Sequence, residues 1–344
     1  MKVLLVDWLG RGGIAQTSMA WRRALLAAGA EPYVVTRRGR ELATDVMPTP
    51  TPPIPGAGRL LEHAAVVRGA VRAIAALRPA MVIIQNYVLP VLEQSVYRAA
   101  RRANAAVVTV VHDHRLHSPL AGSGVGLDAA LRASDVVYTH TAYVADRIDP
   151  AGRTIRLIPH PLQLDLLEES GNPLWPATSD PTAIHFGVLK RSYKGTDLIV
   201  ALSQDPATRP WRFAVLGAGA PPQGPRLLSC AGYVPAPDLV ASIRAADAAI
   251  LPYSFATQSG AVVLAQALGK TCVASAVGGI PEQIEDGVTG RLVPAGAGTA
   301  GWAEVLLSLR RDPAARTRMG EAGRRATHEA HQRFTAEVAA LVAG

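Results

Sequence analysis

The chain has 344 residues, of which 49% are hydrophobic and 18% charged. This composition excludes a disordered or collagen-like protein, and the length suits two domains of roughly 150–190 residues. No run approaches the roughly 20 apolar residues that span a bilayer, and the start lacks the basic region of a signal peptide, so we expect a cytoplasmic protein. Two cysteines, Cys230 and Cys272, are too few for a disulfide framework or a cysteine-rich metal site.

The net charge of +8 is unevenly distributed along the chain. Residues 1–165 hold 19 lysines and arginines against 12 acidic residues, whereas residues 166–344 hold 16 against 15. The basic first half indicates an anionic partner, which is a membrane surface, a phosphorylated acceptor or nucleic acid, or it serves solubility alone. Nucleic acid is the weakest of these partners, because only 5% of the residues are aromatic and none interleave with a basic stripe.

The first half alternates short apolar runs with helical patterns. The runs predict strands at 3–6, 33–36, 81–84, 106–111, 135–139 and 155–158. Helical periodicity covers about 14–28 and 58–77, and the proline-rich stretch 47–57 predicts a loop. Strands that alternate with helices favour a parallel sheet with helices on both faces.

The polar, proline-rich segment 166–181 predicts a linker, after which the same rhythm restarts. Strands are expected at 183–186, 212–216, 248–251, 271–274 and 291–293. The tail from Trp302 to Ala343 has a helical pattern with a break near Asp312-Pro313. The sequence therefore predicts an α/β protein with two doubly wound domains, 1–165 and 182–325.

A glycine turn, Gly10-Arg11-Gly12-Gly13, follows the first strand and exposes N–H groups that attract a phosphate or carboxylate. The alternative is a tight strand-to-helix turn. The turn is not a spaced G-x-G-x-x-G, and the second strand ends in Arg37-Arg38 rather than in an acidic residue, which disfavours a nicotinamide enzyme. The Walker pattern of P-loop nucleotidases and the Asp-x-Asp pair of metal-dependent sugar transfer are both absent.

Two loops of the second half are candidate phosphate sites. The loop 186–195 carries Lys190, Arg191 and Lys194. One interpretation is that these cations neutralise a bound diphosphate, and the alternative is a basic loop that faces solvent. The segment 252–260 leads into a second helix start, where Gln258 and Gln266 are two turns apart and are expected on one face.

In combination, these motifs resemble those of a retaining GT-B glycosyltransferase of family 4. The resemblance spans almost the whole chain and rests on the order of its motifs rather than on any one of them. The motifs are Gly12-Gly13, His112, Ile158-Pro159-His160-Pro161, Lys194-Gly195, Gly232-Tyr233-Val234, Leu251-Pro252-Tyr253-Ser254, Gln258 to Lys270, Gly278-Gly279-Ile280-Pro281-Glu282 and Asp286-Gly287-Val288-Thr289-Gly290.

The resemblance implies two Rossmann-like domains facing across a cleft, with the acceptor on the first and a nucleotide-activated sugar on the second. It also implies that the helix 326–344 returns to the first domain. Arg191 and Lys194 would hold the diphosphate, with Lys190 as a rival, and His112 would face the reacting carbon of the donor sugar. The remaining residues implied in donor binding are Gly12, Gly13, Gly187, Gly232, Tyr233, Val234, Gln258, Ser259, Gly260, Ala261, Val262 and Gln266.

The sequence departs from the family at the E-x7-E glutamate pair, which is replaced here by Gln258 and Gln266. In the family, the first glutamate contacts the transferred sugar and the second the nucleotide ribose. Glutamine keeps the shape but loses the charge, and charge-assisted hydrogen bonds are roughly twice as strong as neutral ones. Three interpretations stay open: an unusual donor sugar, an ordinary subclass that tolerates glutamine, or lost transfer.

The expected reaction moves a sugar from a nucleoside diphosphate to an acceptor hydroxyl or amine, with anomeric retention and without a metal. The acceptor is a small molecule, a glycan or a lipid-linked molecule, and the basic first domain allows peripheral contact with the inner membrane surface. The alternatives are a non-transferring sugar-nucleotide-binding subunit, and a repurposed enzyme such as an epimerase or pseudo-glycosyltransferase. A metal at His112-Asp113-His114 is disfavoured because adjacent side chains point apart and no third ligand is evident. His112 is alternatively a core histidine, and His160 is alternatively a residue that packs at the domain junction.

Overall fold

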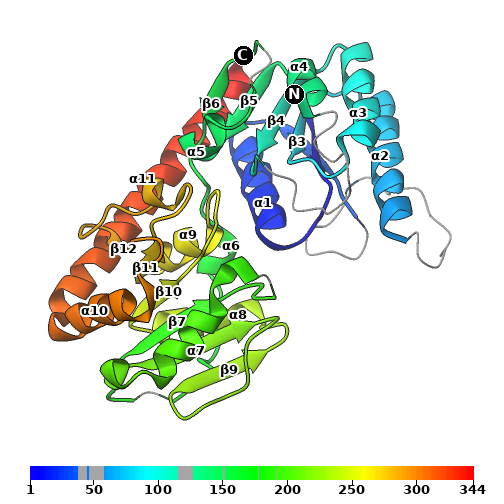
Figure 1. Cartoon of the computed structure of the whole chain (residues 1–344). Coiled ribbons are helices and arrows are strands. Elements are labelled where there is room, and N and C mark those ends of the chain that lie inside the picture. The colour runs from blue at the N-terminus through cyan, green and yellow to red at the C-terminus, as the bar shows by residue number, and fades with distance from the viewer. Residues whose placement is uncertain (38–44, 46–57, 115–126, 150–151, 177, 191) are drawn as a thin grey trace. The chain divides into compact units, whose positions relative to one another are not determined.

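The computed structural model describes residues 1–37, 45, 58–114, 127–149, 152–176, 178–190 and 192–344. These residues divide into two compact units (Figure 1). Unit 1 comprises Met1–Pro161 and Gln332–Gly344, and unit 2 comprises Leu162–His331. Each unit contains a parallel six-stranded sheet with helices packed on it, so the predicted α/β class is confirmed.

The sheet of unit 1 has the strand order β2-β1-β3-β4-β5-β6. Its strands are β1 (Lys2–Asp7), β2 (Glu31–Val35), β3 (Met81–Gln85), β4 (Ala106–Val111), β5 (Val136–Thr139) and β6 (Ile155–Leu157). Its helices are α1 (Gly12–Ala27), α2 (Gly58–Leu77), α3 (Pro90–Arg102), α4 (Leu127–Ala133) and α5 (Ala142–Ala145). All six regions predicted as strands form strands. Strands β1 to β5 are largely buried runs rich in Val, Ile and Leu, as parallel strands covered on both faces require, whereas the edge strand β6 is partly or fully exposed.

Alternation along β1 shows how the two faces are filled. Val3 and Leu5 pack into one core cluster with Trp21 of α1, whereas Leu4 and Val6 pack into another with α2 and α3. Successive side chains of a strand point to opposite faces of the sheet. The apolar run 3–6 therefore needs helices packed on both faces.

The sheet of unit 2 has the order β12-β11-β10-β7-β8-β9. Its strands are β7 (Thr182–Phe186), β8 (Arg212–Gly217), β9 (Leu227–Ala231), β10 (Ala248–Leu251), β11 (Thr271–Ser275) and β12 (Gly290–Val293). Its helices are α6 (Leu164–Leu167), α7 (Thr196–Gln204), α8 (Ala236–Ala245), α9 (Gly260–Ala267), α10 (Gly298–Arg311) and the first part of α11 (Pro313–Ala343). Three 3-10 turns are η1 (Ser192–Lys194), η2 (Pro206–Thr208) and η3 (Ile280–Glu282). The helical tail breaks at Asp312, as expected from the following proline.

Two features of unit 2 differ from the prediction. Strand β9 was missed, because it is a half-buried edge strand whose sequence, Leu227 to Ala231, has no clear alternation. The segment 166–176, expected as part of a linker, packs on unit 2 instead. Trp175 lies in its core, and the Leu174 N–H donates to Ser242 Oγ of α8 over 3.1 Å. The boundary between the units accordingly falls at Pro161–Leu162.

The last helix, α11, contributes to both units. From Gln332 on it belongs to unit 1, a start somewhat later than the expected 326. Phe334 contacts Trp21 edge-on with ring centroids 5.3 Å apart, and the Tyr138 hydroxyl donates to Glu337 over 2.6 Å. Among the described helices, none is long and apolar enough to cross a membrane.

Candidate functional site

Each sheet has one point at which the strand order reverses, and the loops at the carboxyl ends of the strands there form the usual ligand crevice of an open α/β sheet. In unit 2 the reversal lies between β7 and β10, and in unit 1 between β1 and β3. The two predicted phosphate loops of the second half follow β7 and β10, so the topology brings them together.

The loops after β7 and β10 touch through their backbones. The Ser254 N–H donates to the Tyr193 carbonyl over 2.9 Å. Gly195 has φ +69°, and a Cβ there would lie 1.9 Å from the Pro252 carbonyl oxygen. Only glycine fits both this conformation and this approach, which explains the Lys194-Gly195 pair that the sequence shows.

Lys194 is the cation that this contact holds in place. Its ammonium nitrogen lies 4.1 Å from the Tyr253 ring centroid and 5.3 Å from that of Tyr193. Burial lowers the pKa of Lys194. No ion pair among the described residues includes Lys194. A largely desolvated ammonium without an acidic neighbour gives this loop a strong preference for an anion.

The other two cations of this loop are placed differently. Lys190 is exposed, and its backbone packs against Gly219, where a Cβ would lie 2.5 Å from the Lys190 nitrogen. Arg191 lies outside the described residues. Gly187, with φ +121°, follows β7 directly, and its N–H donates to the Leu216 carbonyl over 3.0 Å.

Helix α9 begins beside this loop, and a side chain that the sequence analysis missed braces its start. Ser259 is the N-cap and accepts the Val262 N–H over 3.3 Å. Gln283, just after η3, accepts the Ser259 N–H over 2.8 Å and donates to the Ser259 carbonyl. The N–H of Val262 is therefore already used, whereas Gly260 and Ala261 stand in the first turn, where helix N–H groups lack intrahelical partners.

The two glutamines lie in different environments, and the expectation that they share a helix face was wrong. Helix α9 starts at Gly260, so Gln258 precedes it, and its Oε1 is buried without a hydrogen-bond partner among the described residues. Gln266 is 1% exposed, and its Nε2 donates to the carbonyls of Gln283 and Thr289 over 3.2 and 3.3 Å.

The predicted base-binding turn follows β9. Gly232 has φ +115°, and Tyr233 is 82% exposed. Val234 is partly buried against the core of unit 2. An aromatic ring this exposed offers a free face for stacking.

In unit 1 the glycine turn after β1 is shaped by Asp7, at the end of that strand. The Asp7 carboxylate accepts the N–H groups of Leu9 and Gly10, both over 2.8 Å, and the Ser18 hydroxyl over 2.9 Å. Burial raises the pKa of Asp7, and these hydrogen bonds oppose the shift. Gly12 has φ +61°, and a Cβ on Gly12 or Gly13 would meet no atom within 4 Å. Among the described residues, there is room for a side chain at both glycines.

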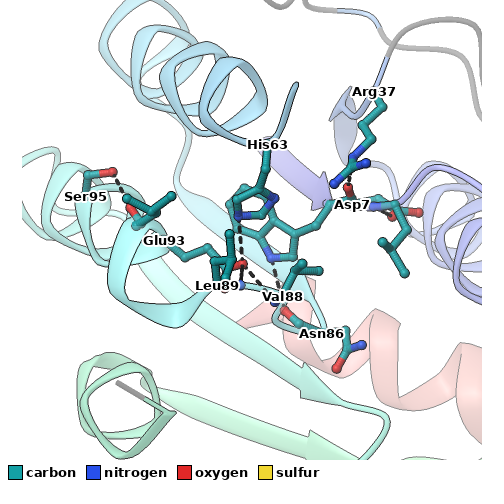
Figure 2. Close-up of polar contacts among 11 residues, drawn as sticks. Asp7, Arg37, His63, Asn86, Val88, Leu89, Glu93 and Ser95 are labelled. Carbon is teal, nitrogen blue, oxygen red and sulfur yellow. Dashed lines mark hydrogen bonds and ion pairs between the residues drawn. The ribbon is translucent and has the colours of Figure 1, made fainter. Parts of the chain in front are cut away.

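The loop after β3 is tied to the glycine turn through side chains that sequence reasoning missed (Figure 2). The Trp8 indole N–H donates to the Asn86 carbonyl over 3.1 Å. Glu93 Oε1 accepts the N–H groups of Val88 and Leu89 and lies 3.1 Å from His63 Nε2. These buried and partly buried contacts hold both loops at the strand-order reversal.

His112 follows β4 and is 3% exposed. Its Nε2 lies 2.9 Å from Gln85 Oε1, at the end of β3. Burial, together with His140 and His160, holds the pKa of His112 well below its usual value. In the described part of the chain, no group of three or more His, Cys, Asp or Glu side chains is placed to hold a metal ion.

Two family models match the chain, one in each half. The model described as Glycosyltransferase Family 4 matches residues 11–166, and the one described as Glycosyl transferases group 1 matches residues 180–312. The chain thus carries a Glycosyltransferase Family 4 domain followed by a Glycosyl transferases group 1 domain.

Several relatives match this chain over a short stretch. The D-inositol 3-phosphate glycosyltransferase of Arthrobacter sp. (strain FB24) is 47% identical over 90 residues, which are 26% of this chain and 21% of that protein. The protein of that name from Kribbella flavida is 43% identical over 90 residues, again 26% and 21% of the two chains. The match therefore spans about a fifth of the length of these relatives.

Solved structures match the whole chain. Sucrose-phosphate synthase from Thermosynechococcus elongatus has a TM-score of 0.75 at 19% identity, over 100% of this chain and 97% of its own. HepE from Anabaena, in complex with UDP-glucose, has a TM-score of 0.70 at 18% identity, over 100% and 98%. The predicted GT-B fold is thereby confirmed.

Proposed function

We propose that this protein transfers a sugar from a nucleoside diphosphate sugar to a hydroxyl or amine of an acceptor. The observation that carries the proposal is the buried ammonium of Lys194, which stands at the strand-order reversal of unit 2 without an acidic neighbour among the described residues. The diphosphate of a sugar nucleotide supplies the anion that such a site favours.

The donor site is assigned to the loops around Lys194. We assign the diphosphate to Lys194, with Lys190 or Arg191 as the second cation, and to the free first-turn N–H groups of Gly260 and Ala261. Gln258 offers its unpartnered Oε1 to a hydroxyl of the transferred sugar. The base is assigned to Gly232, Tyr233 and Val234, with Gly187 lining the same edge of the sheet.

The proposed chemistry keeps the anomeric configuration and needs no metal. The acceptor attacks from the face that the diphosphate leaves, and the departing phosphate oxygen takes the acceptor proton. Lys194 then stabilises the negative charge that grows on the leaving group, which is the role of a preorganised cation in phosphate departure. His112 of unit 1 is assigned a hydrogen bond to the sugar.

The acceptor is the least defined part of the proposal. The excess positive charge of residues 1–165 supports an anionic acceptor. The names of the relatives make a cyclitol phosphate the first compound to test.

The test is a thermal-shift series with nucleoside diphosphates and their sugars, in EDTA and in Mg²⁺, followed by product analysis. We expect one base family to stabilise the protein equally in both buffers, and anomeric NMR to show retention in the transferred product. Donor binding without release of nucleoside diphosphate, across the acceptor panel, would indicate a non-transferring subunit. A new sugar nucleotide formed without acceptor would indicate an epimerase.

A further inference from the structure

Four adjacent strands of unit 1 end in a row of polar side chains. Gln85 is the last residue of β3, and His112 follows β4 directly. His140 follows β5 directly, and His160 comes shortly after β6. Neighbouring parallel strands end at one edge of a sheet, so the topology alone brings these four side chains into line.

The three imidazole rings of this row are in contact. The centroids of His112 and His140 lie 4.8 Å apart in an edge-to-face arrangement, and those of His140 and His160 lie 5.1 Å apart. His112 is therefore held from both neighbouring strands: by the Gln85 hydrogen bond on the β3 side and by the His140 ring on the β5 side.

The hydrogen-bond partners decide where each imidazole carries its proton. His140 Nδ1 lies 3.0 Å from the Ile158 carbonyl, and His160 Nδ1 lies 3.0 Å from the Pro161 carbonyl. A carbonyl oxygen only accepts, so both rings are protonated at Nδ1. With the Gln85 amide oriented so that its Oε1 faces His112 Nε2, the His112 ring is protonated at Nε2 instead.

This pattern leaves two acceptor nitrogens without partners. His112 Nδ1 and His140 Nε2 are buried and have no hydrogen-bond partner among the described residues. Leaving a buried acceptor unsatisfied costs free energy. Burial also lowers the pKa of His140 to about 3 and that of His160 to about 4, so protonation does not relieve this cost near neutral pH.

We propose that His140 is a positioning residue that, with Gln85, fixes His112 as a neutral ring with a free Nδ1 acceptor. The group that His112 receives is then a hydrogen-bond donor, a hydroxyl or an amine, and not a carboxylate or phosphate. The chemical use of His112 rests on the proposed function, whereas its tautomer and orientation do not.

The test begins with ¹⁵N-histidine NMR of the donor-free protein, which separates protonated from unprotonated ring nitrogens. We expect His112 to show one protonated Nε2 and one unprotonated Nδ1. In His140→Asn, the amide still donates to Ile158 but the ring is lost, so His112 should show averaged tautomers. His140→Phe keeps the ring and should keep the His112 pattern.

The second readout is steady-state kinetics with the donor identified above. His140→Asn should lower kcat roughly ten- to hundredfold, as expected for a displaced reacting group, with the donor KM unchanged. His140→Phe should restore most of that loss. The control is His328→Asn, because His328 of α11 also bonds a carbonyl, that of Arg324, but is exposed and outside the site.

A wild-type His112 protonated at Nδ1 would overturn the proposal. An unchanged His112 spectrum together with unchanged kcat in His140→Asn would overturn it as well. If that variant fails to fold, Gln85→Leu tests the same claim, since removing the acceptor should release the Nε2–H tautomer. If the protein transfers no sugar, that result contradicts the proposed function alone. The NMR measurements then still decide whether Gln85 and His140 fix the tautomer of His112.

Discussion

The side-chain amide of Gln266 donates to the carbonyl oxygen of Thr289 over 3.3 Å, and this bond joins helix α9 to the turn before β12. The same nitrogen donates to the Gln283 carbonyl, just after η3. Two carbonyl partners require a donor at this position. The structure thus supplies a reason for glutamine where the family has glutamate: the side chain fastens the segment that in turn braces the start of α9.

Gln266→Glu should therefore destabilise unit 2. A carboxylate facing two carbonyl oxygens has no proton to donate, and we expect the free energy of unfolding to fall by about 1–3 kcal/mol at pH 7. The loss should shrink below about pH 5, where the carboxyl group gains a proton. Denaturant unfolding at both pH values measures this. Gln258→Glu is the matched control, and a Gln266→Glu protein as stable as wild type would contradict the assignment.

Lys194→Met should abolish nucleotide binding without lowering the stability of the folded protein. Burial of an ammonium without an acidic neighbour disfavours the folded state, so the variant should unfold at the same or a higher temperature than wild type without ligand. It should lose the stabilisation by nucleoside diphosphates, and turnover should fall roughly 10²- to 10³-fold.

Lys270→Met is the control for that experiment. Burial also lowers the pKa of Lys270, but the neighbouring Asp247 opposes this shift. This variant should keep nucleotide binding. Equal nucleotide binding by wild type and Lys194→Met would remove Lys194 from the donor site.

Gly195→Ala should be strongly destabilising. The residue combines a left-handed φ with a Cβ position 1.9 Å from the Pro252 carbonyl oxygen, so the loops after β7 and β10 would have to separate. We expect a loss of about 2 kcal/mol or more in the free energy of unfolding. Gly13→Ala, whose Cβ meets no atom within 4 Å, should be neutral or slightly stabilising by the same measurement. Similar losses in both variants would contradict this account.

Stability should fall as the pH drops below about 6.5. Burial lowers the pKa of His160 and His185 to about 4 and that of His140 to about 3. Between pH 6.5 and 4 the unfolded chain binds protons that the folded chain does not, so stability is complete above pH 6.5 and is lost toward pH 4. Each unit of pKa depression corresponds to about 1.4 kcal/mol.

His160→Asn provides the check on this pH dependence. An Asn amide can replace the Nδ1–H donor to the Pro161 carbonyl without titrating in this range. Unfolding measured at pH 7.5, 6 and 5 should show a shallower decline in this variant. A decline as steep as in wild type would mean that His160 does not contribute.

The sequence predicted the fold well, because buried parallel strands are uninterrupted apolar runs such as 81–84 and 106–111. The edge strand β9 was missed because its half-buried residues carry no such signal. The sequence did not predict the contact between the loops after β7 and β10. It showed only that a glycine, Gly195, follows Lys194, and the structure explains that glycine by its close approach to Pro252. Arg191 and the roles of the predicted site residues stay predictions.

Side chains that act through distant partners gave no sequence signal. Glu93 and His63 meet across thirty positions, and Gln283 reaches back to Ser259 from a different turn. The sequence placed Gln266 in the donor site by analogy with the family, whereas its amide partners could be found only in three dimensions.

The assignment of the last residues of α11 to unit 1 determines when that unit is complete during translation. Residues 1–161 leave the ribosome first, but Phe334 and Val338, which fill the core of the same unit beside Trp21, are synthesised only after unit 2. All of unit 2 is made in between. Unit 1 therefore lacks part of its hydrophobic core until all of unit 2 has been synthesised, and the apolar surface exposed in that interval favours aggregation.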